Sequence, residues 1–260
     1  MPQHRYAIVE ARDAIGGTWD LFRYPGVRSD SDMYTLGYRF KPWRQAMAIA
    51  DGSAIRAYVR ETAVENVIDK QIRFRHRVTA AAWCSKDARW TVDMACGEDA
   101  APLQISCNFL YLGAGYYRYD KGYTPELPGI ESYRRRVVHP QHWPEELVYA
   151  GQRVVVIGSG ATAITLLPAL AQTAAHVTML QRSPNYVAAL PAQDAAALRL
   201  QRHLPPAWAY ALARWKLVSM GMASAISSAR WTGCRARVRG RPGSCTRTIC
   251  ATSCNCAGAR

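Results

Sequence analysis

Acidic residues are missing from the last quarter of this sequence. The 260 residues include 33 lysines and arginines but only 19 aspartates and glutamates, and no acidic residue follows Asp194. Seven arginines from Arg230 to the chain end supply half of the formal net charge of +14. The remaining positive charge forms no stripe with interleaved aromatic residues, so we expect no nucleic-acid partner. A modest basic excess suits an anionic dinucleotide.

Paired cysteines and long apolar runs are also missing. Five of the eight cysteines follow residue 230, and residues 250–256 lack the paired spacing and nearby histidine of a zinc site. No apolar run reaches the roughly 18 residues of a membrane-spanning helix. We therefore expect no metal, no disulfide and no transmembrane segment. No signal peptide opens the chain, which predicts a cytoplasmic protein, with peripheral membrane association left open.

A first glycine loop has no counterpart either. Residues 6–10 form a short apolar run ending in Glu10. This pattern predicts the second strand of a nucleotide-binding βαβ unit, with a carboxylate for the ribose hydroxyls. Only five residues precede the run, too few for the first strand and its phosphate-binding loop. We expect the chain to begin inside a domain.

A complete glycine turn is present in the middle of the chain. An apolar run at 154–157 enters a G-x-G-x-x-A turn and continues into a helical segment up to Leu170. This strand–turn–helix context makes the match specific. The glycines allow a tight turn and close approach of a pyrophosphate, and the helix N-terminus offers unpaired N–H groups. The predicted phosphate-binding residues are Gly158, Ser159, Gly160, Ala161, Thr162 and Ala163.

The residues after the next strand select the nucleotide. A second apolar run at 176–181 is followed by Arg182 and Ser183, where an NAD-binding site carries an acidic residue. An arginine there can hold a 2′-phosphate, which a carboxylate would repel. The sequence therefore predicts NADPH, bound in part by these two residues. The plain alternative is a glycine turn that binds nothing, with Arg182 as a surface charge.

Other stretches indicate a small β-layer and a helical region. We expect a helix from Asp51 to about Val67 and helices at 195–203 and 207–222. Loosely alternating antiparallel strands are expected at 72–78, 80–84 and 89–94, and a buried strand at 109–112 before Gly113 and Gly115. Beyond Trp231 the periodicity vanishes, which predicts disorder.

Two further motifs resemble a known family. Gly16-Gly-Thr-Trp-Asp-Leu-Phe-Arg-Tyr-Pro-Gly26, followed by Arg28-Ser-Asp-Ser-Asp32, resembles the flavin-proximal segment of class B flavoprotein monooxygenases. The segment from Tyr133 through His139 to Trp143-Pro144 resembles the fingerprint F-x-G-x-x-x-H-x-x-x-W-P of their Baeyer–Villiger branch. The resemblance covers residues 6 to about 230. It departs at Tyr133, which replaces phenylalanine, and at Arg135, which replaces glycine.

The resemblance implies an α/β fold with two Rossmann-like, three-layer dinucleotide-binding domains, of which the FAD domain is incomplete. Residues 1–145 would form this partial FAD-binding domain with a small antiparallel β-layer. Residues 146–190 would form the NADP-binding unit, 191–230 a helical segment, and 231–260 a disordered tail. The arginine- and cysteine-rich tail resembles a GC-rich gene read out of frame, which is a hypothesis.

The resemblance also implies the chemistry. In this family NADPH reduces FAD, and the reduced flavin takes up O2 as a C4a-peroxyflavin that oxygenates ketones or soft sulfur and nitrogen. The implied substrates are small ketones, thioamides or sulfides, and Asp30 would be the catalytic carboxylate beside the flavin. His139 and Trp143 would couple domain motion to cofactor state, or act as a structural pair. The implied FAD-lining residues are Glu10, Gly16, Gly17, Thr18, Trp19, Asp32, Gly113 and Gly115.

Three interpretations stay open from the sequence. The first is an FAD- and NADPH-dependent monooxygenase of the Baeyer–Villiger type. The second is a flavin-containing N- or S-oxygenase that does not act on ketones. The third is a fragment that retains only weak NADPH binding, since half of the FAD cradle has no counterpart here.

Overall fold

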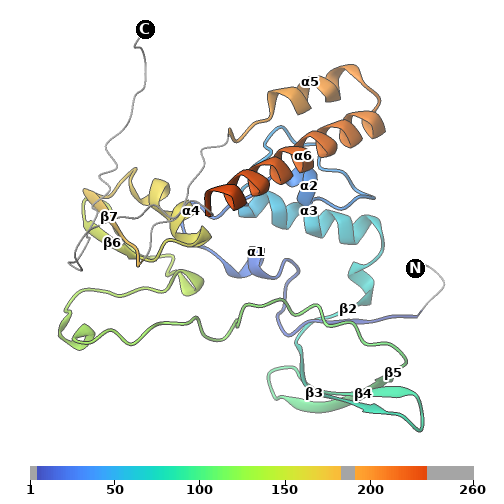
Figure 1. The fold of residues 1–260 in the computed structure, drawn as a ribbon. Helices are drawn as coiled ribbons and strands as arrows, with labels where there is room; N and C mark the ends of the chain where they lie inside the picture. The colour runs from blue at the N-terminus through green and yellow to red at the C-terminus, as the bar shows by residue number, and fades with distance from the viewer. Residues whose placement is uncertain (1–4, 183–190, 233–260) are drawn as a thin grey trace. The chain divides into compact units, whose positions relative to one another are not determined.

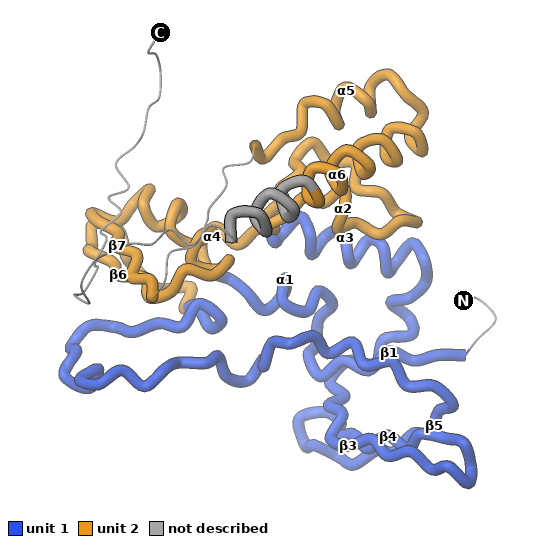
Figure 2. Tube along the Cα trace, viewed as in Figure 1, with its two compact units in different colours: residues 1–23, 52–143 blue, residues 24–51, 144–260 orange. Residues whose placement is uncertain are grey.

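The computed structural model describes residues 5–182 and 191–232, which form two compact units (Figures 1 and 2). Unit 1 comprises residues 1–23 and 52–143, and unit 2 comprises residues 24–51 and 144–260. Residues 24–51 therefore group with the later part of the chain, and the last change of unit falls between Trp143 and Pro144. The domain boundaries expected from the sequence, after residues 145, 190 and 230, remain predictions. Ser183 and most of the tail expected to be disordered lie outside the described residues.

Unit 1 contains a short parallel strand pair linked through a helix. Strand β1 (Ile8–Val9) pairs with β2 (Ile72–Arg73), with Ile8 opposite Ile72. Between them lie α1 (Thr18–Leu21), α3 (Gly52–Glu65) and the 3₁₀ turn η1 (Asp69–Gln71). Helix α3 buries Ile55, Tyr58 and Thr62 at three- and four-residue spacing, which gives it one apolar face. The predicted strand ending at Glu10 and the predicted helix are thus confirmed, with shorter bounds.

An antiparallel three-stranded sheet completes the regular part of unit 1. Its order is β3 (His76–Cys84), β4 (Arg89–Cys96) and β5 (Ala101–Cys107). The prediction of separate antiparallel strands at 72–78 and 80–84 is wrong, because β2 is parallel and β3 continues through an irregularity between Val78 and Ala80. Strand β5 was not predicted from the sequence. Leu103, Ile105 and Cys107 alternate with polar residues as in a strand, but Pro102 near its start lacks the N–H that a ladder hydrogen bond needs and so argues against one.

The predicted buried strand at 109–112 is also wrong. This stretch contains no strand, and the side chains of Phe109, Tyr111 and Leu112 are 79%, 83% and 79% exposed. A strand forms only where a neighbouring strand satisfies its N–H and C=O groups. Within the described residues no strand pairs with this stretch. The chain continues through two 3₁₀ turns, η2 (Ile130–Ser132) and η3 (Pro140–His142).

Unit 2 contains the predicted strand–turn–helix–strand. Strand β6 (Arg153–Ile157) runs parallel to β7 (His176–Leu180), and α4 (Ala161–Leu170) connects them (Figure 1). Helix α4 packs on one face of the pair and buries Ala163, Leu166 and Leu170. On the strands, alternate residues point to opposite faces. Val155 and Ile157 are consequently 60% and 58% exposed.

A helical hairpin forms the rest of unit 2. Helix α5 (Ala195–His203) packs against α6 (Pro206–Thr232), and the short α2 (Met33–Leu36) packs on α6. Proline suits the first position of α6, where its missing N–H costs nothing. Both long helices confirm the sequence prediction. None of the helices within the described ranges combines the length and apolar character needed to cross a membrane.

Candidate cofactor site

The glycine turn between β6 and α4 is open to a ligand. Gly158 has φ = 123°, a backbone conformation that favours glycine, and its N–H donates to the carbonyl of Leu180 at 2.8 Å. Gly160 caps α4 without a side-chain hydrogen bond. A Cβ atom added at either glycine would meet nothing within 4 Å. The turn therefore has room for a phosphate beside the unpaired N–H groups and positive dipole of α4.

The structure places Arg182 just beyond the carboxyl end of β7, where β6 also ends in its glycine turn. In parallel α/β sheets, ligands bind at the carboxyl ends of the strands. Arg182 and the glycine turn thus meet at the same edge of the β6–β7 pair, as the sequence predicts. Ser183, the second predicted nucleotide ligand, lies outside the described residues.

The loop Gly16–Gly17 in unit 1 also has glycine-specific geometry. The φ angles of Gly16 and Gly17 are 131° and 56°, and α1 begins directly after them. Thr18 and Trp19 form the first residues of this helix and are half-buried. Upstream, the Glu10 carboxylate accepts a hydrogen bond from the Arg12 N–H at 2.9 Å. Five of the implied FAD-lining residues therefore lie within the ten-residue stretch 10–19 of unit 1, in or near this loop.

Asp20 is a buried carboxylate that the sequence did not single out. Its side chain is 7% exposed and forms salt bridges with Arg12, Arg23 and Arg56, the last at 3.1 Å. These arginines come from the segment after β1, the segment after α1, and α3. Through Arg56, Asp20 therefore links α1, which follows the Gly16–Gly17 loop, to α3. No sequence signal connects Asp20 with Arg56, because the two residues are 36 positions apart and belong to different elements.

The electrostatics around this loop follow from burial and charge pairing. Burial alone would raise the pKa of Asp20, but hydrogen bonds from Arg12 and Arg56 hold it below its ordinary value. Burial, together with the nearby Glu10 carboxylate, raises the pKa of the Tyr119 hydroxyl. The Arg12 guanidinium lies 5.7 Å from the centre of the Tyr119 ring. At neutral pH Asp20 is therefore charged and Tyr119 is neutral.

The flavin-proximal motif divides between the two units after Arg23. In unit 2, Gly26 lies against α4, since a Cβ atom added there would come within 2.5 Å of the carbonyl oxygen of Thr165. Buried Tyr24 lies beside it, with its hydroxyl 3.4 Å from that of Thr165. Tyr24 and Gly26 of the motif therefore pack on α4, the helix that follows the glycine turn.

Asp30 and Asp32, two carboxylates of this motif, have different surroundings. Asp32 caps α2, accepting from the Thr35 N–H and hydroxyl, both at 2.8 Å. Asp30 is exposed and accepts a hydrogen bond of 3.4 Å from the Ser31 hydroxyl. Asp32 therefore has a structural role as the N-cap of α2, whereas the Asp30 carboxylate faces solvent.

The fingerprint residues lie at the end of unit 1. His139 caps η3 through Nδ1, which accepts from the Gln141 N–H at 3.2 Å. Gln141 is buried and donates from its side chain to the carbonyl of Arg118. Gly122, not singled out from the sequence, lets the chain pass the His139 ring, because an added Cβ would come within 2.2 Å of that ring. The half-exposed Tyr133 follows η2, and the fingerprint ends where the chain enters unit 2.

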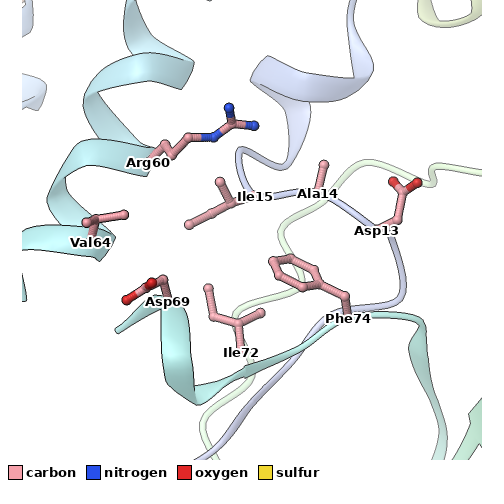
Figure 3. A pocket seen from close by; sticks show the side chains of 8 residues that line it. All are labelled: Asp13, Ala14, Ile15, Arg60, Val64, Asp69, Ile72 and Phe74. Carbon is pink, nitrogen blue, oxygen red and sulfur yellow. The ribbon is translucent and has the colours of Figure 1, made fainter. Parts of the chain in front are cut away.

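Gly113 and Gly115 are the remaining implied FAD residues of unit 1. Both lie in the exposed stretch that follows residue 112, and Gly115 has φ = 71°. Unit 1 also has a cavity of about 240 Å³ (Figure 3), and one residue of its lining, Ile15, directly precedes Gly16. Its lining is mainly apolar and includes Ile15, Ile72 and Phe74. It lies beside the β1–β2 crossover, and none of the predicted cofactor ligands lines it.

Comparison with known proteins shows which protein family this chain resembles. The flavin-binding monooxygenase-like family model matches residues 46–195. The chain is 52% identical over 223 residues to the FAD-containing monooxygenase EthA of Mycolicibacterium smegmatis, covering 85% of this chain and 45% of that protein. It is 48% identical over 234 residues to the putative FAD-containing monooxygenase MymA of Mycobacterium tuberculosis, covering 88% and 47%. The chain thus spans slightly less than half the length of these relatives.

Solved structures agree with this class. An oxidized steroid monooxygenase bound to NADP matches with a TM-score of 0.59 and 32% identity, over 69% of this chain and 34% of that chain. A complex of OTEMO with FAD and NADP matches with a TM-score of 0.60 and 31% identity, over 71% and 35%. The predicted α/β fold of a flavin monooxygenase is confirmed. The chain belongs to the flavin-binding monooxygenase-like family, which confirms the resemblance to flavoprotein monooxygenases carried by residues 16–32 and 133–144; within these, residues 29–32 and 139–144 fit the similarity to EthA.

Proposed function

We propose that this chain carries the NADPH-binding part, and a portion of the FAD-binding part, of a Baeyer–Villiger-type monooxygenase. The observation that carries the proposal is the open turn at Gly158 and Gly160, with Arg182 at the same strand edge. The turn would hold the pyrophosphate of NADPH and Arg182 its 2′-phosphate. A cytoplasmic location is proposed with it and is tested by cell fractionation.

The family resemblance also assigns residues to the flavin. Glu10 would accept from the ribose hydroxyls, and the Gly16–Gly17 loop, with its positive φ angles, would allow close approach of the cofactor backbone. By the same resemblance, Asp30 would be the carboxylate beside the flavin, and His139 and Trp143 would couple domain motion to cofactor state. Bound FAD would supply the oxygen-activating chemistry, with NADPH as the source of electrons.

A second candidate is a chain that binds NADPH and no FAD. The exposed side chains of Phe109, Tyr111 and Leu112 favour it, because the predicted FAD contacts at Gly113 and Gly115 follow a stretch that is not packed into a sheet.

Purification of the full 260-residue chain distinguishes the two candidates. A yellow protein that retains FAD through gel filtration and oxidises NADPH supports the monooxygenase. A colourless protein that binds NADPH in calorimetry and takes up no added FAD supports the second candidate. A chain that binds neither nucleotide contradicts both. For a yellow protein, product analysis with a cyclic ketone and with an aryl sulfide separates Baeyer–Villiger activity from S-oxygenation alone.

A further inference from the structure

Helix α6 reaches the segment that carries Asp30 through one arginine. The Arg214 Nη1 donates to the carbonyl of Thr35 at 2.8 Å and lies 3.3 Å from the carbonyl of Tyr34. These carbonyls belong to the last turn of α2, where a helix has unpaired C=O groups and the negative end of its dipole. A guanidinium at this position donates hydrogen bonds to these carbonyls and offsets the negative end of the helix dipole. The interaction links residues about 180 positions apart in the chain.

The rest of this segment is held from the other side. The Ser29 N–H donates to the Ala50 carbonyl at 2.8 Å, and the Ala50 N–H donates to the Ser29 hydroxyl at 3.0 Å. The Met33 N–H donates to the Ala48 carbonyl at 2.7 Å. These bonds fix the start of the segment to residues 48–50. The C-terminal end of α2 is held instead by the hydrogen bonds from Arg214 and by the buried side chain of Tyr34.

Tyr34 is the apolar anchor of the same segment. Its side chain is 1% exposed, and its hydroxyl donates to the Gln45 carbonyl at 3.1 Å. Burial raises the pKa of this hydroxyl, so it stays a neutral donor. Between the two anchored ends, the Asp30 carboxylate projects into solvent. The position of Asp30 is therefore set by its neighbours rather than by contacts of its own side chain with the core.

We propose that Arg214 is a positioning residue that holds residues 29–37, and with them Asp30, in the geometry needed to face the flavin. The inference rests on the proposed function for its flavin part. Its structural part rests on the two carbonyl contacts alone. The proposal gives α6 a part in cofactor binding, although the sequence indicates no cofactor ligand in that helix.

The test compares three variants of the full chain. Arg214→Met removes the guanidinium and keeps an unbranched apolar stem, and Arg214→Lys keeps a charged donor. Lys216→Met is the matched control, because Lys216 is a cation two residues away on α6 whose salt bridge goes to Asp194 at the start of α5. The polar contacts that the structure gives Lys216 go to Asp194, which lies outside residues 29–37.

Hydrogen exchange of the nucleotide-free chain gives the first result. Amides at 35–37, which bond to Asp32 and Met33, should exchange on the order of tenfold to a hundredfold faster in Arg214→Met, as expected for a lost charge-assisted hydrogen bond. Arg214→Lys should recover part of the protection. Lys216→Met should leave these amides unchanged and speed exchange at the start of α5. Unchanged exchange at 35–37 in Arg214→Met overturns the structural part.

FAD titration gives the second result. The FAD dissociation constant should rise about tenfold in Arg214→Met and less in Arg214→Lys, with the Lys216→Met value equal to the wild type. At saturating FAD, the visible absorption band of the flavin should shift in Arg214→Met only. Equal affinity and an equal spectrum in Arg214→Met overturn the flavin part. A wild-type chain that takes up no FAD overturns the proposed function and the flavin part together, while the exchange comparison still decides the structural part.

Discussion

The Asp20 carboxylate accepts a hydrogen bond from the Arg56 guanidinium at 3.1 Å, which ties the loop after Gly16 and Gly17 to α3. Asp20 is nearly fully buried, whereas Arg56 is 31% exposed. A carboxylate at this depth persists only with its charge compensated. The positive φ angles of the loop are thus maintained by a contact with a helix more than thirty residues downstream.

Replacing Asp20 by Asn should destabilise unit 1. The change leaves three arginines around a buried position without their shared counter-charge. We expect a loss of about 2–4 kcal/mol, near the lower part of the range for buried pairs because the arginines are partly solvated. Urea unfolding at neutral pH measures it. Asp120→Asn, which disrupts a more exposed ion pair with Arg118, is the control and should cost far less than Asp20→Asn. Equal stability of both variants would contradict a structural role for Asp20.

The stability of the α5–α6 hairpin should depend on acid through Asp194. Burial alone would raise the pKa of this group, but the hydrogen bond from Lys216 and those from the Ala197 and Ala196 amides lower it below 3.8. Its stabilising contribution is therefore present above the unfolded-state value of 3.8 and is lost as pH falls through the lower folded-state value. Asp194→Asn keeps an N-cap and removes the charge.

The measurement for Asp194 is the difference in unfolding free energy between wild type and Asp194→Asn at several pH values. We expect about 0.5–1 kcal/mol in favour of the wild type at neutral pH, with the difference vanishing as the medium becomes more acidic than the folded-state pKa. Taking a difference cancels the titration of other carboxylates. A difference independent of pH would contradict this account.

The two turn glycines should separate folding from nucleotide binding. Gly158 has φ = 123°, so Gly158→Ala should cost about 1–3 kcal/mol of stability. Gly160 has φ = −74° and open space around its Cβ position, so Gly160→Ala should change stability by about 1 kcal/mol or less. The added methyl group should nevertheless weaken NADPH binding about tenfold or more, because it occupies the place of a phosphate. Thermal unfolding and calorimetry measure the two effects. Undiminished NADPH affinity in Gly160→Ala would argue against a phosphate at this turn.

Arg182 should decide between NADPH and NADH. Arg182→Ala should raise the NADPH dissociation constant about tenfold to a hundredfold and leave the NADH value nearly unchanged, because only NADPH carries the 2′-phosphate. Arg153→Ala is the matched control, since Arg153 is exposed at the opposite end of β6. Parallel losses for both nucleotides would indicate a general charge effect instead.

The bare face of the β6–β7 pair should promote self-association. Val155 and Ile157 are mostly exposed on the face that α4 does not cover, and Leu180 is 48% exposed opposite Ile157. The double variant Val155→Thr with Ile157→Thr keeps β-branched side chains and should reduce association in sedimentation experiments. Val78→Thr, also 46% exposed but on β3, is the control. A wild type that sediments as a monomer at all concentrations would refute the expectation.

Local signals explain which elements could be predicted. The β6–α4–β7 unit follows from an apolar β-branched run, two glycines and a helical period, all within thirty residues. Asp194 before an alanine-rich stretch likewise marks the start of α5. The stretch at 109–112 has the same apolar character but no neighbouring strand in the described residues, and an apolar run alone cannot supply one. Strand β5 was not predicted because Pro102 near its start argues against a strand, although the residues after it alternate between apolar and polar.

The sequence by itself determined the β6–α4–β7 unit with its glycine turn and the family, because each depends on residues that are close together in the chain; it also predicts the nucleotide preference through Arg182. Only the tertiary structure decided that Asp20 gathers three arginines and that Gly122 adjoins His139. It also decided that Arg214 reaches the carbonyls of α2. These contacts join side chains through space, and a charged residue carries no mark of which distant partner will neutralise it once both leave water.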